Sequence, residues 1–360
     1  MPAADAGRSG SARPLPDGVG DTADPSQPRW RRTVRTVGPW ILTALILVVL
    51  VTLAQGLEWA EVWETLTTLH WWQLAVLVLG LLMRQLLNCL PLVWFIDGCS
   101  VPRAFQNDQA SAVMYAVAPP PADYVTRMAM FGSWGIALPA ATAGAVMNTL
   151  SFYVIRFGAP LLGVLVMIVT GMYDSAEIVP ALLSALISVA ILLAIWLGFR
   201  DERLAASIGG WAARVVGRFK RGIDIDAWRD SVVAFRHAAY RRVSSALPRS
   251  LLALVAMVVV DAGLIVLSIR FVGVPADQLS AVPVLTAFLV AYPLTALFFS
   301  GLGVLDAVVI ATLLYHVDVD RSLEPELVAA FLIWRVISLG VPLVLGALSL
   351  IAWKIELARR

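Results

Sequence analysis

The stretch PVLTAFLVAYPLTALFFSGLGVLDAVVIATLLY, from Pro283 to Tyr315, decides the fold that we predict for this chain. It is longer than the roughly 20 residues of a straight transmembrane helix, and Ser300-Gly301-Leu302-Gly303 interrupts its apolar run just before Asp306. Within a bilayer, non-helical backbone and a carboxylate are tolerated only where they are buried in protein or line a cavity. We therefore expect two half-length helices in a re-entrant hairpin that turns at Gly301 and carries part of a polar site.

The composition of the whole chain is typical of a helical membrane protein. Of its 360 residues, 59% are hydrophobic and 14% are charged, whereas a soluble domain has about 25% charged residues. We predict an all-α, polytopic fold with about six full spans and two re-entrant broken-helix hairpins. The two cysteines, Cys89 and Cys99, and the scattered histidines have no spacing typical of a disulfide framework or a metal site. No cofactor motif is present.

The charges beside the apolar runs predict how the chain is oriented in the membrane. Arginines precede the first run, residues 200–249 are strongly basic, and the linker 173–177 is acidic. Because positive charge marks cytoplasmic segments, we expect both termini and 200–249 in the cytoplasm and 173–177 outside. Only one crossing then fits between the second span and this linker, so residues 109–149 should form a hairpin that enters from the cytoplasmic side. The expected spans are residues 38–56, 72–96, 150–172, 178–199, 250–272 and 328–353.

This topology divides the chain into four parts and favours the plasma membrane as its location. Residues 200–249 alternate apolar and basic side chains, which predicts amphipathic helices on the anionic inner leaflet. Nucleic acid is the weaker alternative for this segment, because it lies between two spans. The four parts are a disordered cytoplasmic tail at 1–28, an N-terminal membrane half at 38–199, the basic loop at 200–249 and a C-terminal membrane half at 250–355.

The same topology implies an inverted duplication. Residues 72–172 and 250–353 would each consist of a span, a hairpin and a span, with opposite orientations in the membrane. The two hinges, near Pro120 and Gly301, fall about halfway through their blocks. Interrupted segments at corresponding positions of inverted repeats indicate a substrate site near the middle of the membrane.

The C-terminal third resembles a known family of membrane proteins. The segment Ser300-Gly301-Leu302-Gly303-Val304-Leu305-Asp306 is followed by an apolar half-helix and by Phe331-Leu332-Ile333-Trp334-Arg335-Val336-Ile337-Ser338. This pattern resembles the flippase-like transmembrane family, which includes the lysylphosphatidylglycerol synthase transmembrane region and archaeal dolichol-glycosylation-type integral membrane proteins. The chain departs from the family pattern where Phe299-Ser300 replaces Pro-Gly and Asp306 replaces Glu.

A second motif of this family is a proline-rich turn with an acid and an arginine. Its counterpart here is Pro120-Pro121-Ala122-Asp123 with Arg127, which lacks the usual glycine and spaces the acid and the arginine by four residues. The resemblance implies lipid translocation, or the handling of a lipid-linked precursor, without the chemistry of the soluble synthase domain.

The hinge and the charges near it are the first candidate binding residues, because intramembrane charges are usually functional. Asp306 could bind a cationic headgroup or a proton, or it could cap a half-helix. Arg335 could neutralise a phosphate, or it could hold Asp306 in place. The hinge residues Ser300, Gly301 and Gly303 belong to the same predicted site.

Charges in the other apolar runs complete the candidate site. Arg84 could contact a lipid phosphate or pair with Asp261. Asp123 and Arg127, one helical turn apart, could bind a headgroup or form a local pair. Two further arginines, nearer the predicted span ends, are expected to snorkel to the interface: Arg156 and Arg270.

Together these features favour a flippase-like protein that translocates or binds an anionic phospholipid or a polyprenyl-linked lipid. Membrane lipids are the expected partners, with no cofactor, metal or nucleic acid. One alternative is a non-catalytic membrane scaffold of an envelope or glycosylation complex. A second is an integral membrane lipid-modifying enzyme, for which the sequence offers no nucleophile or metal cluster at one depth. We therefore expect a protein that is not an enzyme.

Overall fold

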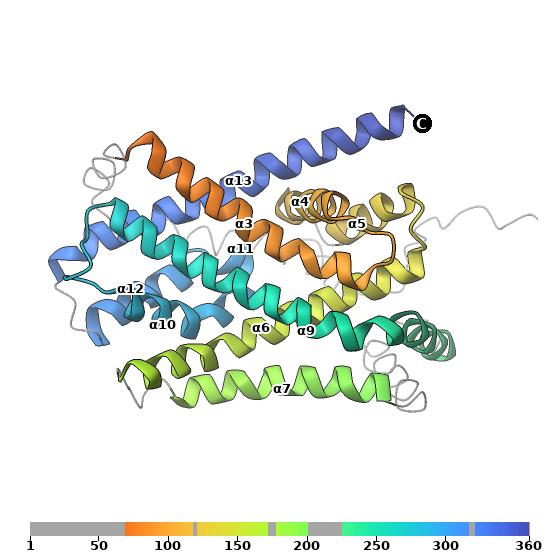
Figure 1. The fold of residues 1–360 in the computed structure, drawn as a ribbon, viewed down its shortest axis with the longest axis horizontal. Helices are drawn as coiled ribbons and strands as arrows, with labels where there is room; N and C mark the ends of the chain where they lie inside the picture. The colour runs from red at the N-terminus through yellow and green to blue at the C-terminus, as the bar shows by residue number, and fades with distance from the viewer. Residues whose placement is uncertain (1–68, 118–120, 172–177, 201–224, 317–320, 360) are drawn as a thin grey trace, which may run out of the picture. The chain divides into compact units, whose positions relative to one another are not determined.

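The regular elements that the computed structural model describes are all helices, which confirms the all-α class (Figure 1). The predicted tail at 1–28, the predicted span at 38–56 and residues 201–224 of the predicted basic loop lie outside the described residues. The structure describes residues 69–117, 121–171, 178–200, 225–316 and 321–359.

Among the described residues, four helices are long and apolar enough to cross a membrane. They confirm apolar helices at the predicted spans 72–96, 250–272 and 328–353, and they make this a membrane protein. Their outer faces expose large apolar side chains such as Leu79, Leu252 and Val344, and in a bilayer these faces contact lipid. The helices are α3 (Trp71–Phe95), α6 (Leu138–Thr170), the Ser245–Phe271 part of α9 (Ile225–Phe271) and α13 (Glu324–Ala358).

A helix is also present at the predicted span 178–199. This helix, α7 (Ile178–Arg200), packs against α6, and two of its serines donate hydrogen bonds to α6 backbone carbonyls. Ser184 Oγ donates to the carbonyl of Phe157 at 2.8 Å, and Ser188 Oγ donates to that of Val154 at 2.9 Å. Small hydroxyl residues allow helices to approach closely within a membrane, so these two bonds fix the register of α7 on α6.

The prediction of a hairpin over residues 109–149 is wrong for its second arm. Residues 138–149 belong to α6, which runs without a break to Thr170 and replaces the span predicted at 150–172. The helix begins after Gly135, whose φ of 77° suits glycine, and Pro139 lies in its first turn, where proline is tolerated. Two shorter helices, α4 (Val101–Val117) and α5 (Ala122–Ser133), pack against each other before it.

The apolar stretch from Pro283 to Tyr315 is broken into several short helices, as predicted. Pro293 lies where α10 gives way to the 3-10 helix, and the backbone reverses at Ser300, Gly301 and Gly303, which have φ values of 57°, 68° and 78°. A Cβ atom on Gly301 would lie 2.5 Å from the carbonyl oxygen of Leu294, so only glycine fits this turn. The pieces are α10 (Ala281–Ala291), the 3-10 helix η2 (Tyr292–Ala296), α11 (Phe298–Gly301) and α12 (Val304–His316).

The two membrane blocks pack in a reciprocal way. Helices α3 and α9 lie against each other, and α13 of the second block packs on α4 of the first, while α6 of the first packs on α10 of the second. Gly346 of α13 lies against the backbone of Gln109 on α4. Gly163 of α6 lies against the backbone of Thr286 on α10. The α13–α4 and α6–α10 contacts thus each join an element of one predicted block to an element of the other.

The close approach of α13 to α4 predicts the effect of one added methyl group. A Cβ on Gly346 would collide with the Gln109 carbonyl and would lie 2.8 Å from Cβ of Val113. We expect Gly346→Ala to lower the free energy of unfolding by about 1–3 kcal/mol through overpacking, measured as a lower Tm in detergent micelles. The matched variant Gly340→Ala has nothing within 4 Å and should not lower the Tm. Equal melting of both variants would contradict the α13–α4 contact.

Candidate functional site

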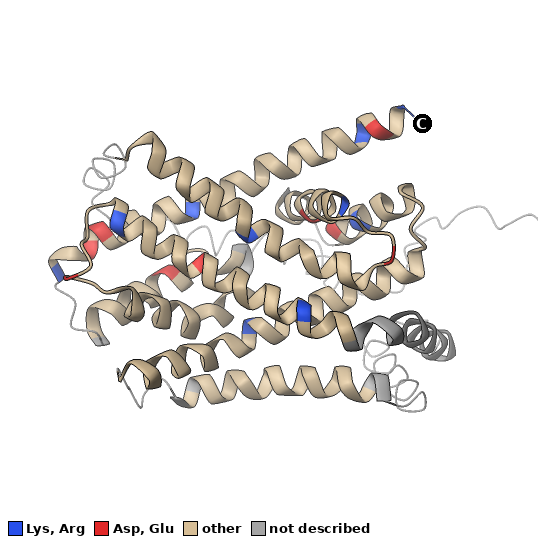
Figure 2. Cartoon of the chain, viewed as in Figure 1, with Lys and Arg blue, Asp and Glu red and all other residues tan. Residues whose placement is uncertain are grey.

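Three arginine–carboxylate pairs lie in the interior of the described helices, and Figure 2 shows that charged residues are few along these helices. Each pair joins two helices that are distant or separated by a turn in the sequence. A charge at membrane depth is stable only when it is paired or hydrogen-bonded, so these pairs are the most demanding feature of the fold. They are Arg84–Asp261 between α3 and α9, Arg127–Asp108 between α5 and α4, and Arg335–Asp306 between α13 and α12.

The helix break holds the first pair of the site. Arg335 Nε lies 2.9 Å from both carboxylate oxygens of Asp306, and its Nη1 donates to the carbonyl of Ser300 at 3.3 Å. Asp306 Oδ2 also accepts a 2.9 Å hydrogen bond from the backbone N–H of Gly303, which caps the start of α12. The structure thus brings together the predicted residues Ser300, Gly303, Asp306 and Arg335, with Gly301 at the turn itself.

The second pair lies at the contact of α3, α9 and α13. Arg84 Nε donates to Asp261 Oδ2 at 3.3 Å, and the indole N–H of Trp334 donates to Asp261 Oδ1 at 3.1 Å. Asp261 is only 4% exposed, so these two donors carry most of its neutralisation. Trp334 precedes Arg335 in the chain, and the Arg335 guanidinium lies 4.4 Å from the centre of its ring. Two adjacent residues of α13 therefore donate to the two carboxylates: Trp334 to Asp261 and Arg335 to Asp306.

The third pair corrects a sequence-based hypothesis. Arg127 does not form the local pair with Asp123; its Nη2 lies 3.1 Å from Oδ1 of Asp108 on α4. The other oxygen of Asp108 accepts a 2.7 Å hydrogen bond from Asn88 on α3. Asp123 lies in the first turn of α5, where a negative charge suits the helix dipole.

A polar chain connects the second and third pairs. Arg84 Nη1 donates to Gln85 Oε1 at 2.6 Å, and Gln85 Nε2 donates to Gln109 Oε1 at 3.1 Å. Gln109 follows Asp108 on α4. The sequence analysis missed Gln85, Asp108, Gln109 and Trp334 as site residues, although the polar run of residues 106–109 within a hydrophobic chain was a usable signal.

Helices α4 and α5 carry several buried polar atoms that have no hydrogen-bond partner among the described residues. They are Asn107 Oδ1, Gln109 Nε2 and Ser111 Oγ on α4, and Arg127 Nη1 on α5. An unsatisfied buried polar atom costs about 1–3 kcal/mol. These donors and acceptors are therefore free to bind a polar headgroup or water.

Arg156 is placed differently from the prediction. It lies in the middle of α6 instead of near a span end, so it cannot simply snorkel to the interface. Its guanidinium lies 4.5 Å from the centre of the Phe152 ring and 5.2 Å from that of Tyr153, and its buried Nε has no hydrogen-bond partner. Arg270, by contrast, donates to three backbone carbonyls of the loop that follows α9.

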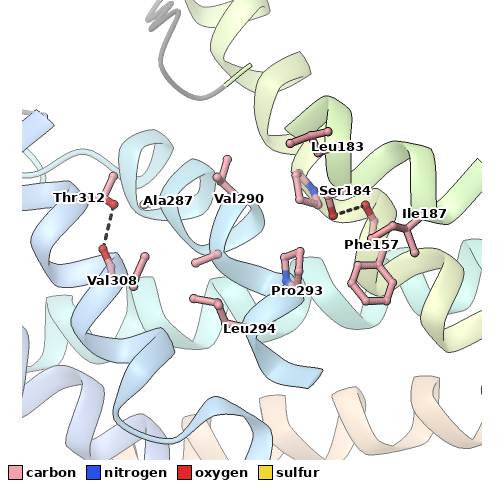
Figure 3. Close-up of a pocket in the computed structure, with 12 residues that line it drawn as sticks. Phe157, Leu183, Ser184, Ile187, Ala287, Val290, Pro293, Leu294, Val308 and Thr312 are labelled. Carbon is pink, nitrogen blue, oxygen red and sulfur yellow. Dashed lines mark hydrogen bonds between the residues drawn. The ribbon is translucent and has the colours of Figure 1, made fainter. Parts of the chain in front are cut away.

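An apolar cavity of about 420 Å³ lies between α6, α7, α10 and α12 (Figure 3). The two hydroxyl groups on its wall are already used, because Ser184 donates to the Phe157 carbonyl and Thr312 donates to that of Val308. The wall therefore offers hydrocarbon surface. Its lining residues are Phe157, Pro160, Leu183, Ser184, Ile187, Ala287, Val290, Ala291, Pro293, Leu294, Val308 and Thr312.

The two cysteines have no visible role in the site. Both are buried and free. Cys99 lies between α3 and α4, where burial raises the pKa of its thiol to about 11, against the opposing effect of Arg103 and Arg127. The thiol is therefore protonated and poorly reactive at neutral pH. Among the residues with described coordinates, no group of three His, Cys, Asp or Glu side chains could hold a metal ion.

Comparison of this chain with protein-family models, with curated proteins and with solved structures finds no match in any of the three.

The Arg335–Asp306 pair predicts a strong coupling between two substitutions. Asp306→Asn and Arg335→Gln should each lower the free energy of unfolding by about 3–5 kcal/mol, because each leaves a buried charge without its partner. The double variant removes both charges and should recover a large part of that loss. Thermal unfolding of the purified protein in detergent measures all three. Losses that simply add in the double variant would contradict a direct pair.

Proposed function

We propose that this protein is a flippase-like membrane protein that binds an anionic lipid and moves it across the plasma membrane. The observation that carries the proposal is the set of three Arg–Asp pairs inside an apolar helical protein, one of them at a broken helix. Intramembrane charges of this kind typically mark a substrate path. The resemblance of the hinge and of Arg335 to flippase-like proteins agrees with this function.

The reciprocal packing supports an inverted repeat as the basis of transport. In the proposed arrangement α3 to α6 form one repeat and α9 to α13 the other, with opposite orientations. The α4–α5 hairpin would enter from the cytoplasm, and the α10–α12 hairpin would enter from outside. Substrate sites of such proteins lie at the repeat interface near the membrane midplane, where rocking of one repeat alternates access.

The ion pairs suggest how a charged headgroup could pass without leaving an isolated charge in the membrane. Arg84, Arg127 and Arg335 each have a carboxylate partner within 3.3 Å. In the proposed mechanism a lipid phosphate replaces a carboxylate at one of these arginines. The released carboxylate, Asp261 or Asp306, would then meet an amine of the headgroup or a proton. Partner exchange keeps the local charge balanced at each step.

Lipid translocation by the reconstituted protein tests this proposal. Vesicles that contain the protein and a trace of phosphatidylglycerol with a fluorescent headgroup are treated with an impermeant quencher. Protein-free vesicles should lose roughly half of the signal, because the quencher reaches only the outer leaflet. Vesicles with the wild-type protein should lose nearly all of it.

The double variant with Asp306→Asn and Arg335→Gln is the informative comparison, because it avoids an unpaired charge in the fold. The double variant should remain folded in detergent. Its rate of lipid movement should be at least about tenfold lower than that of the wild type, because the lipid phosphate loses the charge-assisted hydrogen bonds of Arg335. Arg321→Gln, at an exposed arginine, should keep the wild-type rate. Wild-type protein that moves no more lipid than empty vesicles would instead indicate a membrane scaffold.

A further inference from the structure

Arg156 differs from the other interior arginines of the described helices. Arg84, Arg127 and Arg335 each have a carboxylate, whereas Arg156 has aromatic rings and no acid in contact within the described part of the chain. Its Nε atom is buried and has no hydrogen-bond partner among the residues that the structure describes. A guanidinium in the middle of a membrane helix is costly without a counter-charge, so a bound anion would stabilise Arg156.

The apolar cavity begins at the same point of α6. Phe157 follows Arg156 directly, and Pro160 lies one helical turn further on the same side; both line the cavity. The ring of Phe157 stacks on that of Tyr153, with 6.2 Å between ring centres and an interplanar angle of 13°. Arg156 does not itself line the cavity, but it lies in the same turn of α6 as the lining residue Phe157.

Lining residues on both sides of the cavity are exposed at the lipid-facing surface. Leu183 and Ile187 on α7 are 62% and 46% exposed, and Val308 on α12 is 40% exposed. Figure 3 shows the lining side chains on two sides of the space, from α10 and α12 on one side and from α6 and α7 on the other. An acyl chain could enter sideways from the bilayer without crossing a polar barrier.

We propose that the groove between α6, α7, α10 and α12 binds one acyl chain of an anionic phospholipid, with the lipid phosphate on Arg156. This inference deepens the proposed function and rests on it for the choice of a lipid as the occupant. The volume falls within the range of about 300–1,000 Å³ that is usual for ligand sites. A guanidinium binds phosphate with two parallel hydrogen bonds, one of which would use the Nε of Arg156 that has no partner among the described residues.

The charge around Arg156 selects the headgroup class. No described carboxylate contacts it, so the positive amine of a zwitterionic lipid would face a positive guanidinium without compensation. An anionic headgroup such as phosphatidylglycerol meets no such repulsion. The site should therefore prefer anionic to zwitterionic phospholipid.

Photo-crosslinking locates the lipid directly. The full-length protein is reconstituted in neutral lipid with a trace of phosphatidylglycerol that carries a diazirine in one acyl chain. After irradiation, mass spectrometry of peptides should place the label on α6, α7, α10 or α12. Excess unlabelled phosphatidylglycerol should compete, whereas phosphatidylcholine should compete about tenfold less well. Stronger competition by a polyprenyl phosphate than by phosphatidylglycerol would overturn the choice of an acyl chain.

Two sets of variants test the phosphate site at Arg156 and the apolar groove separately. Arg156→Gln should reduce labelling about tenfold, Arg156→Lys should retain part of it, and the exposed control Arg321→Gln should leave it unchanged. Leu183→Trp should fill the groove and reduce labelling. Leu182→Trp, an exposed neighbour that does not line the groove, should not. Wild-type labelling in Arg156→Gln, or equal labelling in both tryptophan variants, would overturn the inference.

The translocation assay separates this inference from the proposed function. Arg156-dependent labelling in a wild-type protein that moves no lipid would support the lipid groove and refute transport. Transport by a protein that shows no groove labelling would refute the groove and leave transport standing. Labelling requires a bound lipid but no transport. Tm measurements on each variant show whether a loss of labelling results from a loss of folding.

Discussion

A charged side chain surrounded by hydrocarbon must be neutralised within the protein, and the described helices are arranged around this constraint. Asp261, Asp306 and Asp108 each lie within 3.3 Å of an arginine from another helix. Removing one partner of such a pair costs about 3–5 kcal/mol, which is a large part of the stability of a typical domain. The pairs therefore fix where α3, α9, α12 and α13 can lie relative to one another.

The charges also connect the helix break to the rest of the protein. Without its hydrogen bonds to Ser300 and Gly303, the turn between α11 and α12 would leave backbone polar groups unsatisfied at membrane depth. Asp306 and Arg335 satisfy these groups and neutralise each other. Trp334, the residue before Arg335, donates a hydrogen bond to the carboxylate of Asp261. Local backbone geometry and long-range electrostatics thus depend on the same two positions of α13.

Hydropathy and glycine placement predicted the parts of the fold that depend on local sequence. The apolar helices α3, α9 and α13 and the interruption at residues 300–303 follow from the sequence, because each reflects a local property of the chain. The pairing of Arg127 could not be predicted, because Asp108 is nineteen residues away and the polar residues 106–109 interrupt the apolar pattern inside its helix. The length of α6 was missed for a different reason: the loop charges allowed only one crossing before residue 173, so residues 138–149 were assigned to a hairpin. In the structure these residues continue into one helix that passes through Pro160 and packs against α7 and α10.

The central claim is that residues 281–316 fold back within the membrane, so that both ends of this segment lie on one side. Single cysteines at Asp277 and Arg321, which flank the segment, test it through labelling of intact cells with an impermeant maleimide; the native cysteines are buried and contribute little background. Arg359→Cys reports the cytoplasmic side. The account predicts labelling of positions 277 and 321 from outside, and of 359 only after permeabilisation. Labelling of 277 and 321 from opposite sides would contradict it.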